Sequence, residues 1–133
     1  MFRLTRPLFN AAKRTTGITG LKVQPNALPE LVKTYQTTLS VLSTIPETSV
    51  YRQGVEALTR HRLNIVESAN GDLTAAAEKL GEGQIEEALD VANDELILAT
   101  NMVEWKAWEP LEEKPAPGQW EYAGQTTTAS SSS

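Results

Sequence analysis

The stretch QIEEALDVANDELILATNMVEWKAWEP, residues 84–110, determines the fold because it carries the longest amphipathic pattern in the chain. Its apolar residues recur at steps of three and four, which places them on one face of a helix; they are Ile85, Ala88, Leu89, Ala92, Leu96, Ala99 and Val103. Acidic residues fill the first turns, where they interact favourably with the helix dipole. Pro110 cannot continue the pattern, so we expect a helix from about Gln84 to Trp108.

Two further amphipathic helices precede this one. The first is expected from about Pro29 to Ser43, with the proline in the first turn, where its missing N–H group costs nothing. The second begins after Thr48 or Ser49, either of which can cap it, and ends at the Asn-Gly pair of residues 70–71. Between the second and third helices, DLTAAAEKL (residues 72–80) is a short turn or helix.

These patterns predict an all-α protein, an antiparallel three-helix bundle over residues 29–109. Residues 1–28 are expected to form an extended basic arm, because TTGITG (residues 15–20) and two prolines disfavour a helix. Residues 110–133 are expected to be an irregular segment that contains proline and tryptophan and ends in a Ser/Thr tail. The 133 residues are enough for one domain with a modest core.

Charge is distributed unevenly along the chain. The formal net charge is −5, yet residues 1–29 hold five basic residues and no acidic one. An arm rich in arginine and hydroxyl residues and free of acid is typical of a mitochondrial targeting segment; the alternative is an arm that binds an acidic surface. Nucleic acid is an unsuitable partner, since phosphates would be repelled by the acidic body. No apolar run reaches the roughly 18 residues of a membrane span.

Side chains suited to catalysis are scarce. The chain has no cysteine and only one histidine, His61, which excludes disulfides, thiolate metal sites and multi-histidine sites. We interpret the acidic residues between 86 and 94 as a solvated helix face rather than a cation site. Arg62 lies on an apolar helix face, where its stem can cover the core or its charge can reach a carboxylate of a neighbouring helix. We therefore expect no catalytic residue, no cofactor and no metal, and hence no enzyme.

Tryptophan marks the expected binding surface. All three tryptophans lie within residues 105–120, and tryptophan is enriched in protein interfaces. The alternative, that the first two complete the internal core, is weaker for the third, which follows the PAPG break. The predicted partner interface comprises Trp105, Trp108, Pro110, Trp120 and Tyr122 near the C-terminus and Thr15, Thr16, Gly17 and Gly20 in the arm. We expect the arm to lie extended on a neighbouring protein.

Three blocks of sequence carry a resemblance to a known family. They are KRTTGITGLKV (residues 13–23), IPETSVYRQGVEALTRHRLNIVE (residues 45–67) and GQIEEALDVANDELILATNMVEWKAWEPLEEKPAPGQWEY (residues 83–122). In these blocks the chain resembles the alpha-subcomplex subunit 5 family of accessory subunits of mitochondrial respiratory complex I, the NADH:ubiquinone oxidoreductase. The helix-ending EWKAWEP with a proline-rich link and QW is the most specific part. The long basic start (residues 1–12) and the Ser/Thr tail depart from the family pattern.

The resemblance implies a helical accessory subunit with neither cofactor nor catalytic residue. It implies a place on the matrix side of the mitochondrial inner membrane, in the peripheral arm next to the ubiquinone-reducing module. The expected partners are core and accessory subunits of that arm, in a hetero-oligomer, and the expected role is support of assembly and stability. The alternative is a free matrix adaptor or assembly factor that binds a client through its tryptophan-rich end.

Overall fold

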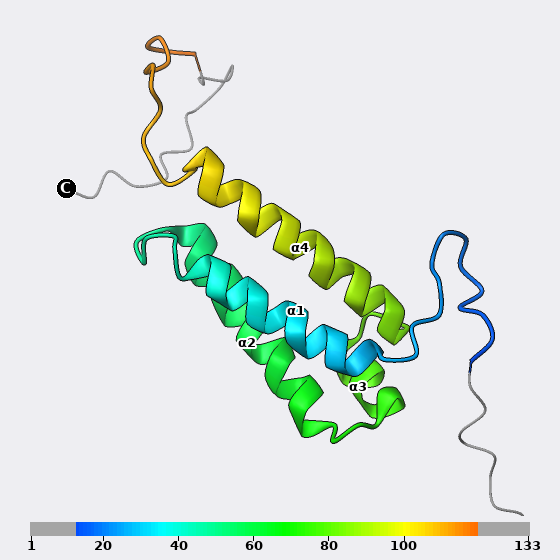
Figure 1. Cartoon of the computed structure of the whole chain (residues 1–133). Coiled ribbons are helices and arrows are strands. Elements are labelled where there is room, and N and C mark those ends of the chain that lie inside the picture. Colours follow the sequence, from blue (N-terminus) through cyan, green and yellow to red (C-terminus); the bar gives the residue numbers. More distant parts are fainter. Residues whose placement is uncertain (1–12, 120–133) are drawn as a thin grey trace, which may run out of the picture.

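The computed structural model of the protein describes residues 13–119. These residues form four helices and no strand: α1 (Ala27–Leu42), α2 (Val50–Ser68), α3 (Leu73–Leu80) and α4 (Ile85–Trp105). The three long helices lie roughly along one axis; α1 and α4 run in the same direction and α2 runs in the opposite one (Figure 1). The all-α prediction is confirmed. The three-helix prediction is corrected by α3, a fourth, short helix.

Local capping explains why residues 73–80 form a helix rather than a turn. The Asp72 side chain accepts hydrogen bonds from the backbone N–H groups of Thr74 (3.0 Å) and Ala75 (3.1 Å), which satisfies donors that have no partner within the helix. Gly81 ends the helix in the left-handed conformation, at φ 70°, which glycine adopts without steric cost. Eight residues with a cap at each end are sufficient for this short element.

The long helices differ from the expected bounds by a few residues. Helix α1 begins at Ala27, so Pro29 is its third residue rather than its first. Helix α4 begins after Gln84, as expected, where Glu87 Oε2 accepts a hydrogen bond from the Gln84 N–H at 2.6 Å. It ends at Trp105 rather than Trp108, because Lys106 adopts the left-handed conformation (φ 50°) and donates its N–H to the Met102 carbonyl. The turn at Lys106, and not Pro110, therefore ends this helix.

The core consists of two apolar clusters arranged along α1. Helix α1 packs against both α2 and α4, whereas α2 and α4 hardly touch each other. The larger cluster joins the first half of α1 to α2, α3 and α4 and includes the fully buried Leu31 and Ala76. The smaller cluster lies at the other end, around the fully buried Leu42, Ile45 and Ala99. Helix α1 is thus the central element of the protein.

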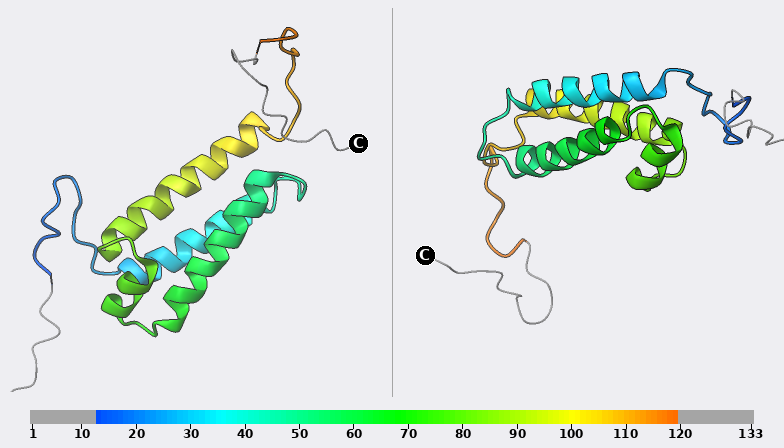
Figure 2. Two further views of the ribbon diagram at one scale, coloured as in Figure 1. Left: turned by 180° about the vertical axis from the view of Figure 1, so that it is seen from behind. Right: turned by 90° about the horizontal axis from the view of Figure 1, so that it is seen from below.

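Helix α3 lies at one end of the protein and contacts both α2 and α4. In the view from behind, α3 lies between the end of α2 and the beginning of α4, and towards their other ends these two helices stand apart with α1 behind them (Figure 2). Within the part of the chain that the structure describes, the side of α2 and α4 that faces away from α1 is therefore covered at one end only.

The arm contacts its own chain, which we did not expect, while its expected contact with a neighbouring protein stays a prediction. Lys13 Nζ forms an ion pair of 2.7 Å with Glu86, and Gln84 Nε2 donates a hydrogen bond of 2.6 Å to the Thr16 carbonyl. Thr16 is buried and donates its hydroxyl to the Leu21 carbonyl at 2.6 Å. The TTGITG stretch has no apolar face, but polar groups in the first turn of α4 hold it.

Candidate interaction surface

Helix α4 carries a second row of apolar residues besides the one that faces α1. Its members are spaced by four and three residues in turn, the pattern by which helices pack in coiled coils; they are the apolar Val91, Leu98, Met102 and Trp105 and the acidic Glu95, here called the α4 seam. Met102 is half-buried and also packs against the smaller core cluster. Val91 is 44% exposed, Leu98 39% and Trp105 62%. Such a row of exposed apolar side chains marks a surface suited to another protein.

A hydrogen bond fixes the side of α4 on which the seam lies. The Tyr51 hydroxyl of α2 donates to Glu95 Oε1 of the α4 seam at 2.7 Å. Burial, followed by the hydrogen bond to Glu95 and the charge of that carboxylate, raises the pKa of Tyr51 above its ordinary value. The α4 seam therefore borders α2. Leu58 lies two helical turns after Tyr51, on the same side of α2, and is 47% exposed.

A polar cluster joins α1, α2 and the α3–α4 turn. Arg62 pairs with Glu82, and both side chains are about four-fifths buried. The Tyr35 hydroxyl of α1 lies near this pair: burial raises the pKa of Tyr35, the charge of Arg62 lowers it and that of Glu82 raises it. The pair matches the expectation that Arg62 reaches a carboxylate, although its partner lies in a turn rather than in a helix. A buried pair of this kind holds α2 against the turn.

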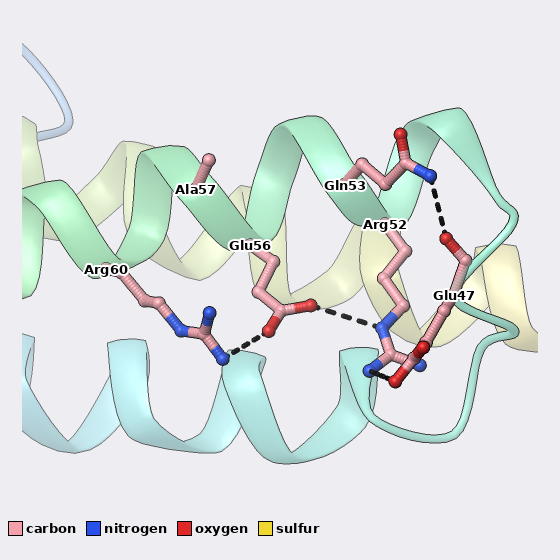
Figure 3. A pocket seen from close by; sticks show the side chains of 6 residues that line it. All are labelled: Glu47, Arg52, Gln53, Glu56, Ala57 and Arg60. Carbon is pink, nitrogen blue, oxygen red and sulfur yellow. Dashed lines mark hydrogen bonds and ion pairs between the residues drawn. The ribbon is translucent and has the colours of Figure 1, made fainter.

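A hollow beside the first half of α2 is lined by a network of balanced charge. It is lined by Glu47, Arg52, Gln53, Glu56, Ala57 and Arg60, with a volume of about 330 Å³ (Figure 3). Arg52 Nε donates to Glu56 Oε2 at 3.1 Å and its Nη1 donates to the Ile45 carbonyl; Arg60 pairs with the same Glu56. Since each arginine is matched by a carboxylate, the network fixes the α1–α2 connection and offers no free charge to a ligand.

The predicted interface residues differ in accessibility. Trp105 and Pro110 are exposed, but Trp108 is partly buried and packs against the smaller core cluster. In the arm Thr15, Gly17 and Gly20 are exposed while Thr16 is buried. Trp120 and Tyr122 lie outside the described residues. Sequence reasoning missed Val91, Leu98 and Leu58, although the spacing of the α4 seam was readable from the sequence.

Two negative findings hold for residues 13–119. No group of three or more histidine, aspartate or glutamate side chains there could hold a metal ion. No helix in that range is long and apolar enough to cross a membrane. His61, the single histidine of the chain, is exposed.

Comparison with known proteins defines first the class and then the family. Residues 20–87 match the family described as "ETC complex I subunit conserved region". A subunit named NADH dehydrogenase (ubiquinone) 1 alpha subcomplex subunit 5, from Bos taurus, is 41% identical over 110 residues, which cover 83% of this chain and 94% of the relative. The chain belongs to this family of complex I accessory subunits, as the resemblance indicated.

Two more relatives support the assignment. NADH dehydrogenase (ubiquinone) 1 alpha subcomplex subunit MCI4 of Candida albicans is 46% identical over 111 residues, 83% of this chain and 79% of the relative. Probable NADH dehydrogenase (ubiquinone) 1 alpha subcomplex subunit 5, mitochondrial, of Arabidopsis thaliana is 44% identical over 103 residues. That match spans 77% of this chain but only 60% of the Arabidopsis relative.

Proposed function

We propose that this chain is a non-catalytic accessory subunit of mitochondrial complex I. It lies on the matrix side of the inner membrane, in the peripheral arm next to the ubiquinone-reducing module, and supports assembly and stability of the complex that transfers electrons from NADH to ubiquinone. Family membership and the names of the relatives support this assignment. The observation that carries a binding role is the exposed α4 seam, which ends in Trp105, 62% exposed.

The proposed partners are core and accessory subunits of the peripheral arm, in a hetero-oligomer. Near the C-terminus Trp105, Pro110, Trp120 and Tyr122 contact them, with a smaller contribution from Trp108. Exposed arm residues around Gly17 and Gly20 provide a second contact, while Thr16 holds the arm to α4. The proposal assigns no catalytic residue, cofactor or metal to the chain.

The proposal is tested by native gel electrophoresis of mitochondrial membranes from cells that express the tagged full chain. We expect the chain to migrate with the megadalton complex, and mass spectrometry of that band to find NADH-oxidising and ubiquinone-reducing core subunits. Migration only at the mass of the free chain or of a small intermediate would contradict the proposal and favour the free adaptor or assembly factor.

The variant Trp105→Ala, with Ile97→Ala as its control, tests whether incorporation into the complex depends on the α4 seam. Both side chains are exposed apolar groups of α4, 62% and 60% respectively, but only Trp105 belongs to the α4 seam. We expect Trp105→Ala alone to reduce the fraction of the chain in the complex. Equal incorporation of both variants would show that the tryptophan is not part of the contact.

A further inference from the structure

Among residues 13–119, the packing of the long helices leaves one bundle position largely unfilled. In a four-helix bundle each helix packs against two neighbours and faces a third across the core. Here α1 contacts both α2 and α4, which hardly touch each other, and α3 contacts α2 and α4 at one end. Helix α3 therefore takes the fourth bundle position, defined here as the one that borders α2 and α4 but not α1.

Helix α3 is too short to fill that position. Its 8 residues span about 12 Å, whereas the 19 residues of α2 and 21 of α4 span about 30 Å. The remaining length borders the α4 seam and Leu58 of α2, whose exposed apolar side chains have no cover within the described residues. Figure 2 shows this region beyond α3, where α1 is visible between the two helices.

The α4 seam has the spacing that a partner helix requires. Val91, Leu98 and Trp105 recur every seven residues, and Met102 lies between the last two, so knobs of a second helix find regularly spaced holes. Glu95 interrupts the apolar row, but it already accepts the hydrogen bond of Tyr51. Glu95 forms no ion pair within residues 13–119, so a helix that packs on this row must leave the second carboxylate oxygen of Glu95 to water or pair it with a basic side chain.

The charges that flank the α4 seam define the partner's chemistry. Helix α4 contains six acidic residues and no lysine or arginine. Asp94 lies one turn from both Val91 and Leu98, and Asp90 stacks one turn before it. Both are exposed, and neither forms an ion pair within residues 13–119. Opposite charge at the flank of an apolar seam sets partner choice between helices.

We propose that the fourth bundle position is completed by a basic amphipathic helix of another subunit. Its apolar side chains pack on the α4 seam and Leu58, and its flanking lysine or arginine side chains face Asp94 and Asp90. Since α3 leaves about 18 Å of the position free, the helix has roughly 12 residues in contact. The inference rests on the proposed function and adds to it the binding face and the chemistry of the partner.

Two other occupants fit the charges less well. A second copy of this chain would bring its own acidic α4 next to Asp90 and Asp94, where like charges repel. An anionic membrane surface would be repelled for the same reason. Both remain measurable outcomes of the test.

The first test places a photo-reactive benzoylphenylalanine at position 98 or at position 97 of the full chain in cells. Ile97, 60% exposed, directly precedes Leu98 but lies on a face of α4 away from the α4 seam. It is therefore the matched control. We expect position 98 to cross-link to one helical segment of another complex I subunit that contains lysine or arginine, and position 97 to cross-link at least about tenfold less. A cross-link from position 98 to a second copy, to lipid or to an acidic or non-helical segment overturns the inference.

The native gel of the same samples separates the two proposals. If the chain migrates with complex I but position 98 forms no cross-link to a subunit, the inference fails and the proposed function stands. If the chain does not migrate with complex I, the proposed function fails. The inference about the binding face is then tested only by measuring the binding of designed peptides to the purified chain.

The peptide experiment uses a designed three-heptad helix with leucine at the seam positions and lysine at the flanks, and a twin with glutamate in place of lysine. Fluorescence anisotropy with the purified full chain is expected to show binding of the lysine peptide at least about tenfold tighter than the glutamate peptide. Asp94→Lys should reverse that preference. Leu98→Gln should weaken the binding of the lysine peptide about tenfold, whereas Ile97→Gln should change its affinity less than about twofold. Equal binding of both peptides, or equal effects at positions 97 and 98, would overturn the inference, provided circular dichroism shows every variant folded.

Discussion

The Tyr51 hydroxyl donates a hydrogen bond of 2.7 Å to Glu95 Oε1 and thereby joins α2 to α4, two helices that hardly touch otherwise. We expect Tyr51→Phe to lower the free energy of unfolding by about 1–2 kcal/mol, because a half-buried carboxylate loses its donor. Urea denaturation measures this loss. In a Glu95→Gln background, Tyr51→Phe should lower the free energy of unfolding by clearly less. An equal decrease in both backgrounds would show that the two side chains are not coupled.

The Arg62–Glu82 pair should contribute to stability mainly through the cost of breaking it. Each side chain is about four-fifths buried, so Arg62→Met alone leaves a carboxylate without its counter-charge and should destabilise the protein by about 2–3 kcal/mol. The double variant Arg62→Met with Glu82→Gln should recover most of that loss. Thermal unfolding of the three variants is the measurement, and a double variant worse than Arg62→Met would contradict this reading.

The Lys13–Glu86 contact should make stability depend on pH. Burial alone would raise the pKa of Glu86, but the hydrogen bond and charge of Lys13, together with backbone hydrogen bonds, hold it below its ordinary value of 4.5. Because the folded pKa is lowered, this stabilisation is complete above 4.5 and is lost as the pH falls through the lowered value.

The variant Glu86→Gln isolates this effect. We expect the unfolding free energy of the unmodified chain, taken relative to Glu86→Gln, to be highest near neutral pH and to fall below about pH 4.5. Lys13→Gln should flatten that dependence. A relative stability that grows on acidification would mean that burial, and not Lys13, dominates the pKa of Glu86.

Trp105 and Trp108 should respond differently to truncation. Trp105 is 62% exposed, so Trp105→Ala should change the free energy of unfolding by less than about 0.5 kcal/mol. Trp108 is partly buried against the smaller core cluster, so Trp108→Ala should cost about 2 kcal/mol, below the value for a fully buried tryptophan. Urea denaturation of the isolated chain checks both values; equal losses would contradict the division between surface and core.

The existence of α1, α2 and α4 was predictable from their apolar steps, and the start of α2 also from its capping residue, Ser49. The end of α4 was not, since a lysine in the left-handed conformation, Lys106, carries no strong sequence signal. The sequence of α3 does not distinguish a turn from a helix, because eight residues give too short an apolar pattern.

The candidate surface was predictable only in part. The tryptophan cluster indicated the C-terminal end of α4, but it could not distinguish exposed Trp105 from partly buried Trp108. That distinction depends on the chain reversal after Lys106, a tertiary feature. The position of Thr16 likewise depends on the hydrogen bond that its carbonyl accepts from Gln84, 68 residues away in sequence.

The central claim is that the chain supports complex I through binding and not through chemistry. The most direct measurement is NADH:ubiquinone activity per iron–sulfur cluster of assembled complex in a strain that lacks the chain. We expect the amount of intact complex and NADH-linked respiration to fall together, because partly assembled arms with uncovered surface are degraded, while turnover per surviving complete complex stays nearly normal. A normal amount of fully assembled complex with abolished activity would contradict the account.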